Sequence, residues 1–237
     1  MRTETKTGTP LRALVIQHEE PTPAGLANEW LTERGAEIET LRIDEQDPHD
    51  LDPRDYDLIV SLGSEFPAYD QSIRWIEHEA DLFQDAYEAD VPNLGLCFGG
   101  QLLARVLGGR VFPAEREEIG WLPVRSRAPD LVPEGPWFQW HFDAFTSPPG
   151  SQVLATTDVG DQAYIVGKSL GLQFHPEVTP EIMDSWVRAY AHELEEHGVD
   201  PEALLHETHE RRDTTRATAW KLFDAFLEQV ARPRERA

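Results

Sequence analysis

Cys97 is the only cysteine among the 237 residues, and its neighbours are typical of a reactive sulfur rather than an inert core residue. The chain reads Gly-Leu-Cys-Phe-Gly-Gly-Gln over residues 95–101, between an apolar run at 91–96 and a helical pattern at 101–107. This order predicts a buried strand that turns sharply into a helix at Cys97. Glycines permit so tight a turn because they carry no Cβ that would clash.

A turn of this kind has chemical consequences for the Cys97 side chain. It would lift the sulfur above the edge of the sheet, as a nucleophile elbow does. It would also aim the first N–H groups of the helix at the sulfur, which favours the thiolate, the nucleophilic form. The sequence therefore predicts that Cys97 is a nucleophile.

A nucleophilic cysteine needs a base to accept and return its proton, and His175 is the best placed of the nine histidines. It follows the apolar run 170–174 and precedes Pro176 and Glu177. Ligands of open α/β sheets bind at the carboxyl ends of the strands, so we expect His175 and Cys97 to meet at one edge. Glu177 could accept a hydrogen bond from the imidazole and fix its tautomer.

His141 and Asp143 allow two interpretations. They could form a second acid–base pair or a metal site, or they could line and support the wall of a pocket, which we favour. The His49-Asp50 pair and the pair His206 and His209 lack a third ligand at credible spacing, so no metal is expected.

Two motifs of this chain resemble those of a known family. Residues 95–101, together with Gln-Phe-His-Pro-Glu at 173–177, are similar to motifs of the class I glutamine amidotransferases. The resemblance covers roughly residues 12–190. The segment 118–124 resembles stand-alone members similar to the amidotransferase part of GMP synthase, and 58–70 resembles the family's strand and oxyanion loop.

The resemblance implies a Cys-His-Glu triad that hydrolyses the side-chain amide of glutamine. Cys97 would attack the γ-carbonyl and form a glutamyl thioester. His175 would protonate the departing ammonia and then activate the hydrolytic water. Glu177 would orient His175. No cofactor is implied.

The resemblance also implies an oxyanion hole made of the backbone N–H of Phe98 and one N–H from Gly63-Ser64. Gln101 would help to bind the substrate amide. The family usually has Gly-Gly-Pro where this chain has Gly-Ser-Glu at 63–65. Serine lacks the conformational freedom of glycine, so which N–H serves the oxyanion stays open. Glu65 would add a negative charge near a pocket meant for an α-carboxylate unless it points away.

The pattern of the remaining chain predicts the elements that position these residues. Strands expected at 12–18, 37–43, 57–63 and 91–96 alternate with helices that end near 34, span about 70–89, and follow Cys97. This alternation predicts a three-layer α/β fold with an open, mainly parallel, flavodoxin-like sheet and helices on both faces. Six apolar runs then predict an additional region of mostly antiparallel strands, at 110–112, 121–125, 137–142, 152–156, 163–166 and 171–174.

Two helices, at about 180–195 and 214–231, are expected to close the chain. The polar residues 1–10 are expected to form a flexible lead-in, and residues 11–237 a single domain. No linker divides the chain.

The charge of the chain restricts its partners. A net charge of −23 repels nucleic acid phosphates and anionic membranes, so neither is expected as a partner. One cysteine cannot form an internal disulfide, which fits a cytoplasmic protein. No apolar run approaches the roughly 20 residues that span a bilayer, and the N-terminus has no secretory signal.

Three functions remain open from these residues. The chain could be a subunit that hydrolyses glutamine and passes ammonia to a separate synthetase, because it carries no Gly-x-x-x-x-Gly-Lys-Ser/Thr phosphate loop of its own. It could instead be a free-standing hydrolase of another γ-glutamyl amide or peptide. A non-catalytic regulatory protein is the least favoured. The sequence does not separate the first two.

Overall fold

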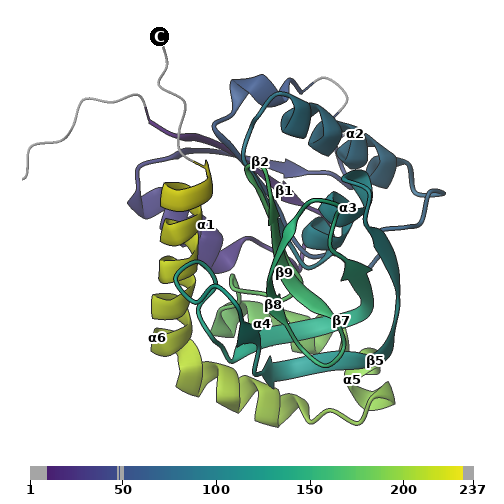
Figure 1. The fold of residues 1–237 in the computed structure, drawn as a ribbon. Coiled ribbons are helices and arrows are strands. Elements are labelled where there is room, and N and C mark those ends of the chain that lie inside the picture. Colours follow the sequence, from purple (N-terminus) through teal and green to yellow (C-terminus); the bar gives the residue numbers. More distant parts are fainter. Residues whose placement is uncertain (1–9, 47, 49–50, 232–237) are drawn as a thin grey trace, which may run out of the picture.

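The computed structural model describes residues 10–46, 48 and 51–231, so the expected lead-in and the His49-Asp50 pair lie almost wholly outside the described residues. Its centre is an eight-stranded sheet in the order β2-β1-β3-β4-β10-β9-β8-β6 (Figure 1). The first five strands are parallel, and they are β2 (Glu37–Arg42), β1 (Arg12–Gln17), β3 (Leu58–Ser61), β4 (Asn93–Leu96) and β10 (Ser169–Leu172). Three antiparallel strands continue the sheet, and they are β9 (Asp161–Val166), β8 (Gln152–Thr156) and β6 (Arg125–Ser126).

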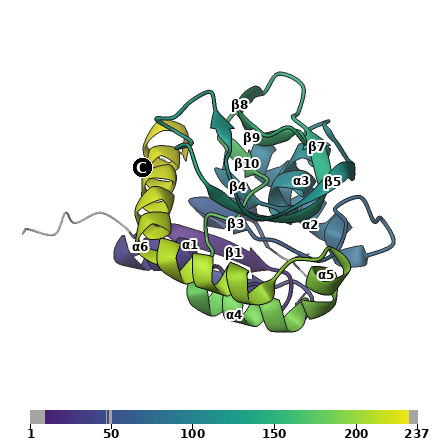
Figure 2. The same cartoon turned by 90° about the horizontal axis from the view of Figure 1, so that it is seen from below.

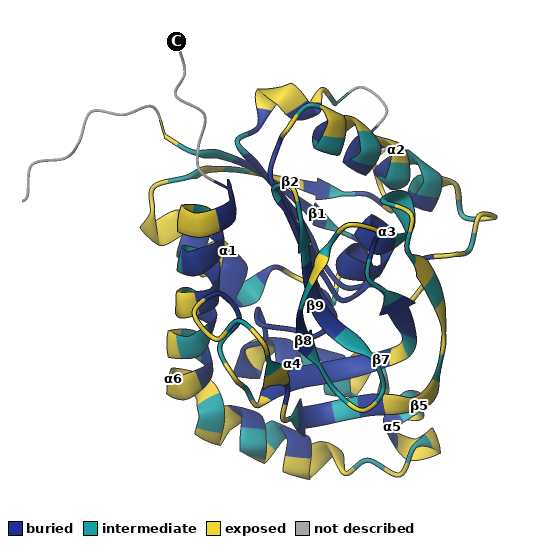
Figure 3. Cartoon of the chain, viewed as in Figure 1, coloured by how far each residue is buried: buried dark blue, intermediate teal, exposed yellow. Residues whose placement is uncertain are grey.

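Helices cover both faces of the sheet, as the alternating pattern predicted (Figures 1 and 2). One face carries α1 (Gly25–Glu33) and α6 (Pro201–Phe226), and the other carries α2 (Arg74–Glu88) and α3 (Phe98–Val106). Strand β1 shows why both faces are covered: Ala13 and Val15 belong to the core on the α1 side, while Leu14 and Ile16 belong to the core on the α2 side. Side chains alternate across a strand, so an all-apolar strand must be buried on both sides (Figure 3). The three-layer α/β fold is confirmed.

A separate antiparallel ribbon, β5 (Arg110–Leu122) and β7 (Trp137–Thr146), packs beside the sheet. Its aromatic residues form a third core with α4 (Pro180–Ala189) and α5 (Ala191–Glu196). Two separate strands were expected at 110–112 and 121–125, which is wrong. The first run and the start of the second lie in one long strand, β5, whose pairing shifts register between Pro113 and Glu118, and Arg125 begins β6. The run expected at 171–174 overlaps β10, which pairs antiparallel with β9, as expected, and parallel with β4 on its other side.

The last helix begins earlier than the apolar pattern suggests, because its start is fixed by capping. Asp200 accepts hydrogen bonds from the N–H groups of Glu202 and Ala203, and Pro201 occupies the first turn. Both are standard signals for the start of a helix. The helix runs to Phe226 and continues as a short π-helical turn, Leu227–Ala231. Among the described residues, no helix combines the length and the apolar character that a bilayer crossing requires.

The pairing of β4 with β10 positions Cys97 and His175. Leu96 pairs with Leu172 in parallel register, and the Cys97 N–H donates to the Leu172 carbonyl at 2.9 Å. The chain therefore leaves both strands at the same edge of the sheet, β4 at Cys97 and β10 shortly before His175. Ligands bind at this edge in open α/β sheets.

Candidate active site

Cys97 occupies a strained turn between β4 and α3. Its backbone has φ 50° and ψ −107°, a combination that non-glycine residues rarely adopt and that surrounding contacts must hold in place. A Cβ at Gly95 would lie 2.5 Å from the backbone of Gly99, and a Cβ at Gly99 would lie 2.5 Å from the Ser61 carbonyl oxygen. The turn therefore depends on glycine at these positions, as the sequence predicted. Helix α3 begins at Phe98, directly after the sulfur.

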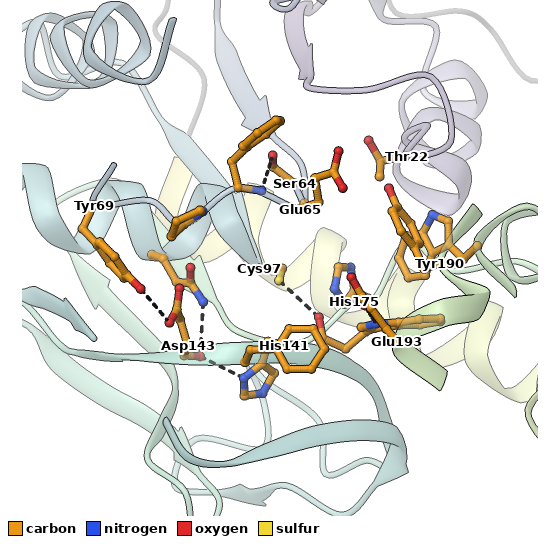
Figure 4. Close-up of a pocket in the computed structure, with 17 residues that line it drawn as sticks. Thr22, Ser64, Glu65, Tyr69, Cys97, His141, Asp143, His175, Tyr190 and Glu193 are labelled. Atoms are coloured by element: carbon orange, nitrogen blue, oxygen red, sulfur yellow. Dashed lines mark hydrogen bonds between the residues drawn. The ribbon is translucent and has the colours of Figure 1, made fainter. Parts of the chain in front are cut away.

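Seven of the expected site residues line one cavity of about 290 Å³, while Phe98 and Glu177 lie outside its lining (Figure 4). Cys97 and His175 both border it, although only 6% and 3% of their surfaces are exposed. The expected residues that also line it are Gly63, Ser64, Gln101, His141 and Asp143. The structure thus brings together side chains from four separate parts of the chain.

His175 is held by its backbone and by Glu177. The His175 N–H donates to the Phe138 carbonyl at 2.8 Å, and Nδ1 lies 2.7 Å from Oε1 of the buried Glu177. Burial by itself lowers the pKa of His175, but the negative charges of Glu177 and Cys97 raise it to about 10. The other ring nitrogen, Nε2, is buried and makes no hydrogen bond to a described residue. It is the atom left to exchange a proton.

Gly63 fits closely against the pair. A Cβ at Gly63 would lie 2.9 Å from Cε1 of His175 and 3.8 Å from Cβ of Cys97, so only glycine leaves the imidazole in place. The hydroxyl of Ser64 donates to Glu19 at 2.5 Å and accepts from the Phe66 N–H at 3.2 Å. Ser64 and Glu65 both line the cavity, so this wall includes the carboxyl group of Glu65.

Gln101, His141 and Asp143 form the opposite wall. The amide nitrogen of Gln101 donates to the Asp143 carbonyl at 3.3 Å and to the Gln173 side chain at 3.2 Å. Nδ1 of His141 donates to the same carbonyl at 2.9 Å, while Nε2 lies 3.1 Å from Glu118. These contacts tie the wall together, as the second interpretation of His141 and Asp143 describes. Within the described ranges, no three potential ligands are grouped to hold a metal ion.

The cavity is acidic and aromatic. Its carboxylates are Glu65, Asp143 and Glu193, and no lysine or arginine is among its lining residues. Burial raises the pKa of Asp143. Six aromatic residues complete the walls, namely Phe66, Tyr69, Trp140, Phe142, Trp186 and Tyr190. The last two come from the α4–α5 region, to which the sequence interpretation gave no role at the site.

The sequence interpretation also missed His18 and Glu79, which form a buried pair behind Gly63. Nδ1 of His18 lies 3.0 Å from the Gly63 carbonyl oxygen, and Nε2 lies 2.8 Å from Glu79. A signal for His18 was present, because it follows the first parallel strand at the same edge that drew attention to His175. Glu79 gave no such signal, since a glutamate within a helix is ordinarily solvated.

Comparisons with known proteins identify the family. The model of the family described as glutamine amidotransferase class-I matches residues 27–194. A GMP synthase (glutamine-hydrolyzing) of Thermus thermophilus is 43% identical over 107 residues, which are 41% of this chain and 21% of that protein. One subunit of a glutamine-hydrolyzing GMP synthase from Sulfurisphaera tokodaii is 33% identical over 135 residues, 53% of this chain and 69% of that relative.

A solved structure is similar over almost the whole chain. A glutamine amidotransferase of Thermotoga maritima superposes with a TM-score of 0.87 at 29% identity, and the match covers 93% of this chain and all of that one. The alignment with the Thermus GMP synthase, by contrast, spans only about a fifth of that longer protein. Because the family model covers most of the sequence, this chain belongs to the class I glutamine amidotransferases.

Proposed function

We propose that this protein hydrolyses the side-chain amide of glutamine through a thioester on Cys97. One observation supports the proposal. Cys97, in its strained strand-to-helix turn, lines the same cavity as His175, and Nδ1 of His175 is hydrogen-bonded to the buried Glu177 at 2.7 Å. A nucleophile, a base and a residue that orients the base are the three components that covalent acyl transfer requires.

The first half of the reaction forms the thioester. The Cys97 sulfur attacks the γ-carbonyl carbon, and the carbonyl electron pair moves onto oxygen. Backbone N–H groups of Phe98 and of Gly63-Ser64 would bind this oxyanion, and one such donor is typically worth about 3–4 kcal/mol in the barrier. The carbonyl then re-forms and the C–N bond breaks, while His175 Nε2–H gives its proton to the nitrogen that leaves as ammonia.

The second half releases glutamate. Neutral His175 takes a proton from a water molecule that attacks the thioester carbon, and the C–S bond breaks to restore the Cys97 thiolate and the imidazolium. Glu177 keeps Nδ1 as the donor nitrogen throughout, so Nε2 is the atom that exchanges protons. Both contacts of Gln101 use its amide nitrogen, so a contact with substrate would use its amide oxygen.

The ammonia would pass to a separate synthetase. This part of the proposal rests on the Sulfurisphaera relative, which is named as one subunit of a GMP synthase, and on the alignment with only a fifth of the longer Thermus enzyme. The lone thiol suits a reducing compartment, so we place the reaction in the cytoplasm.

The cavity walls favour a second candidate, a free-standing hydrolase of another γ-glutamyl amide or peptide. Its six aromatic residues and three carboxylates offer more contact surface than the release of ammonia needs. Aromatic faces beside carboxylates suit a larger amine, particularly a cationic one. The covalent steps would be the same, and only the leaving group would differ.

One experiment tests both candidates. The protein is incubated with glutamine and with a panel of γ-glutamyl amides, and the release of ammonia or amine is measured with a Cys97→Ala variant as control. Preference for glutamine, with a rise when a synthetase is added, supports the first candidate, and full activity on a bulkier amide supports the second. Release that survives in the Cys97→Ala variant contradicts the thioester mechanism.

A further inference from the structure

Behind the oxyanion loop lies a cluster of three polar side chains, and all of them are completely buried. His18 follows β1, Ser61 ends β3 and Glu79 lies in α2. The imidazole bridges the Gly63 carbonyl oxygen, 3.0 Å from Nδ1, and Glu79, 2.8 Å from Nε2. Ser61 donates its hydroxyl to the other oxygen of Glu79 at 2.6 Å.

The partners of His18 determine where its protons lie. A carbonyl oxygen only accepts hydrogen bonds, so Nδ1 must carry a hydrogen. Burial alone lowers the pKa of His18, but Glu79 and the nearby Glu19 attract the imidazolium, and the pKa ends above its ordinary value. The charged groups facing the ring are therefore Glu79 from α2 and Glu19 from the following loop, with Asp44 after β2 more distant. The raised pKa favours the imidazolium, and in either charge state Nδ1 carries the hydrogen that the Gly63 oxygen accepts.

The contact with Gly63 orients the next peptide N–H. In a trans peptide the C=O and the following N–H point in opposite directions. His18 holds the Gly63 oxygen from the side away from the cavity, because Gly63 and Ser64 line the cavity and His18 does not. The Ser64 N–H is thereby turned towards the cavity. The edge of the same imidazole also packs on the ring of Phe98, with centroids 4.6 Å apart.

We propose that His18 is a positioning residue for catalysis, which holds the Gly63–Ser64 peptide so that the Ser64 N–H serves the oxyanion. The inference rests on the proposed function and resolves which N–H of Gly63-Ser64 is used. His18 cannot itself touch a substrate, because none of its surface is exposed. A buried ion pair is in general no more stabilising than well-packed apolar residues, so packing alone does not require it here.

Two substitutions at His18 test the hydrogen bond to Gly63 separately from the contact with Glu79. His18→Asn places an amide nitrogen at the δ position and can still donate to Gly63. His18→Gln places it at the ε position and can reach only Glu79. We expect kcat for amide hydrolysis to fall about 10²–10³-fold in His18→Gln, the effect of losing one oxyanion donor, and about tenfold or less in His18→Asn. The KM should change little in either, and His209→Asn, on the exposed face of α6, is the matched control.

A second readout excludes general damage to the site. Alkylation of Cys97 by iodoacetamide forms no oxyanion, so its rate in His18→Gln should stay at the wild-type value while hydrolysis falls. Equal kcat values for the Asn and Gln variants would overturn the inference and leave the proposed function intact. A wild-type protein that hydrolyses neither glutamine nor any γ-glutamyl amide would overturn both.

The wild-type protein alone provides a test if the variants do not fold. Nitrogen-15 NMR of labelled histidine reports whether each ring nitrogen is protonated. We expect Nδ1 of His18 to be protonated throughout the neutral range. An unprotonated Nδ1 would overturn the inference, because a lone pair cannot bond to the Gly63 oxygen.

Discussion

Replacing Glu177 by glutamine removes one charge from the site and almost nothing else. The glutamine side chain has the same shape, and its amide oxygen can still accept a hydrogen bond from Nδ1 of His175. In the wild-type protein the distance from this nitrogen to Oε1 of Glu177 is 2.7 Å. What changes is the Coulombic attraction that keeps the imidazole protonated. The variant therefore isolates the electrostatic role of Glu177 from its role in orienting the ring.

The size of the effect follows from the pKa of His175. It rises from 6.5 to about 10, and each pKa unit corresponds to about 1.4 kcal/mol, so the net stabilisation of the imidazolium is about 5 kcal/mol. Burial lowers the pKa of His175, so the gain comes from Glu177 and Cys97 together. If Glu177 supplies half, its loss lowers the pKa by about two units and disfavours the imidazolium about 50–100-fold.

The assay is the rate of alkylation of Cys97 by iodoacetamide as a function of pH, together with kcat for amide release. We expect the alkylation rate at about pH 9 to fall about tenfold in Glu177→Gln, because an imidazole whose pKa is about two units lower is largely neutral at that pH and no longer a charged partner for the sulfur. We expect kcat to fall at least about 100-fold, because His175 is also the proton donor to the leaving group. Glu181→Gln, which removes a solvated charge four residues away, should leave both rates unchanged. A Glu177→Gln protein that is alkylated at the wild-type rate and with the wild-type pH dependence would refute the reasoning.

Two further predictions concern the same cavity. Gly63→Ala should lower kcat about 100-fold or more, because the new Cβ would lie 2.9 Å from Cε1 of His175 and displace the imidazole from the sulfur. The kinetics of amide release measure this effect. A variant with the wild-type kcat would contradict the prediction. The pKa of His175 is higher in the folded chain than its ordinary value of 6.5, so its contribution to stability is complete below that pH and is lost as the pH rises towards about 10. Urea unfolding of wild type and of His175→Gln should therefore differ more at about pH 6 than at about pH 9.5, and a difference that grows with pH would show that the direction is wrong.

Much of this molecule could be predicted from local sequence alone. Glycines on both sides of Cys97 predicted a tight strand-to-helix turn, and the structure shows that a Cβ at Gly95 or Gly99 would collide with backbone. Alternating apolar strands and helices predicted a parallel sheet covered on both faces. These features follow from steric rules and periodicities that act over a few residues, so neighbouring residues are sufficient to specify them.

Other features depend on which segments become neighbours. Strand β10 pairs antiparallel with β9, as expected, but it also pairs parallel with β4, and this second pairing brings His175 and Cys97 to one cavity. The aromatic wall from α4 and α5 and the buried contact of His18 with Glu79 arise in the same way, because their partners lie far apart in the chain. The sequence by itself determined which residues have reactive side chains and which turns the backbone can make. The tertiary structure decided which of those side chains meet, because contacts between distant segments depend on how whole strands and helices pack rather than on any local pattern.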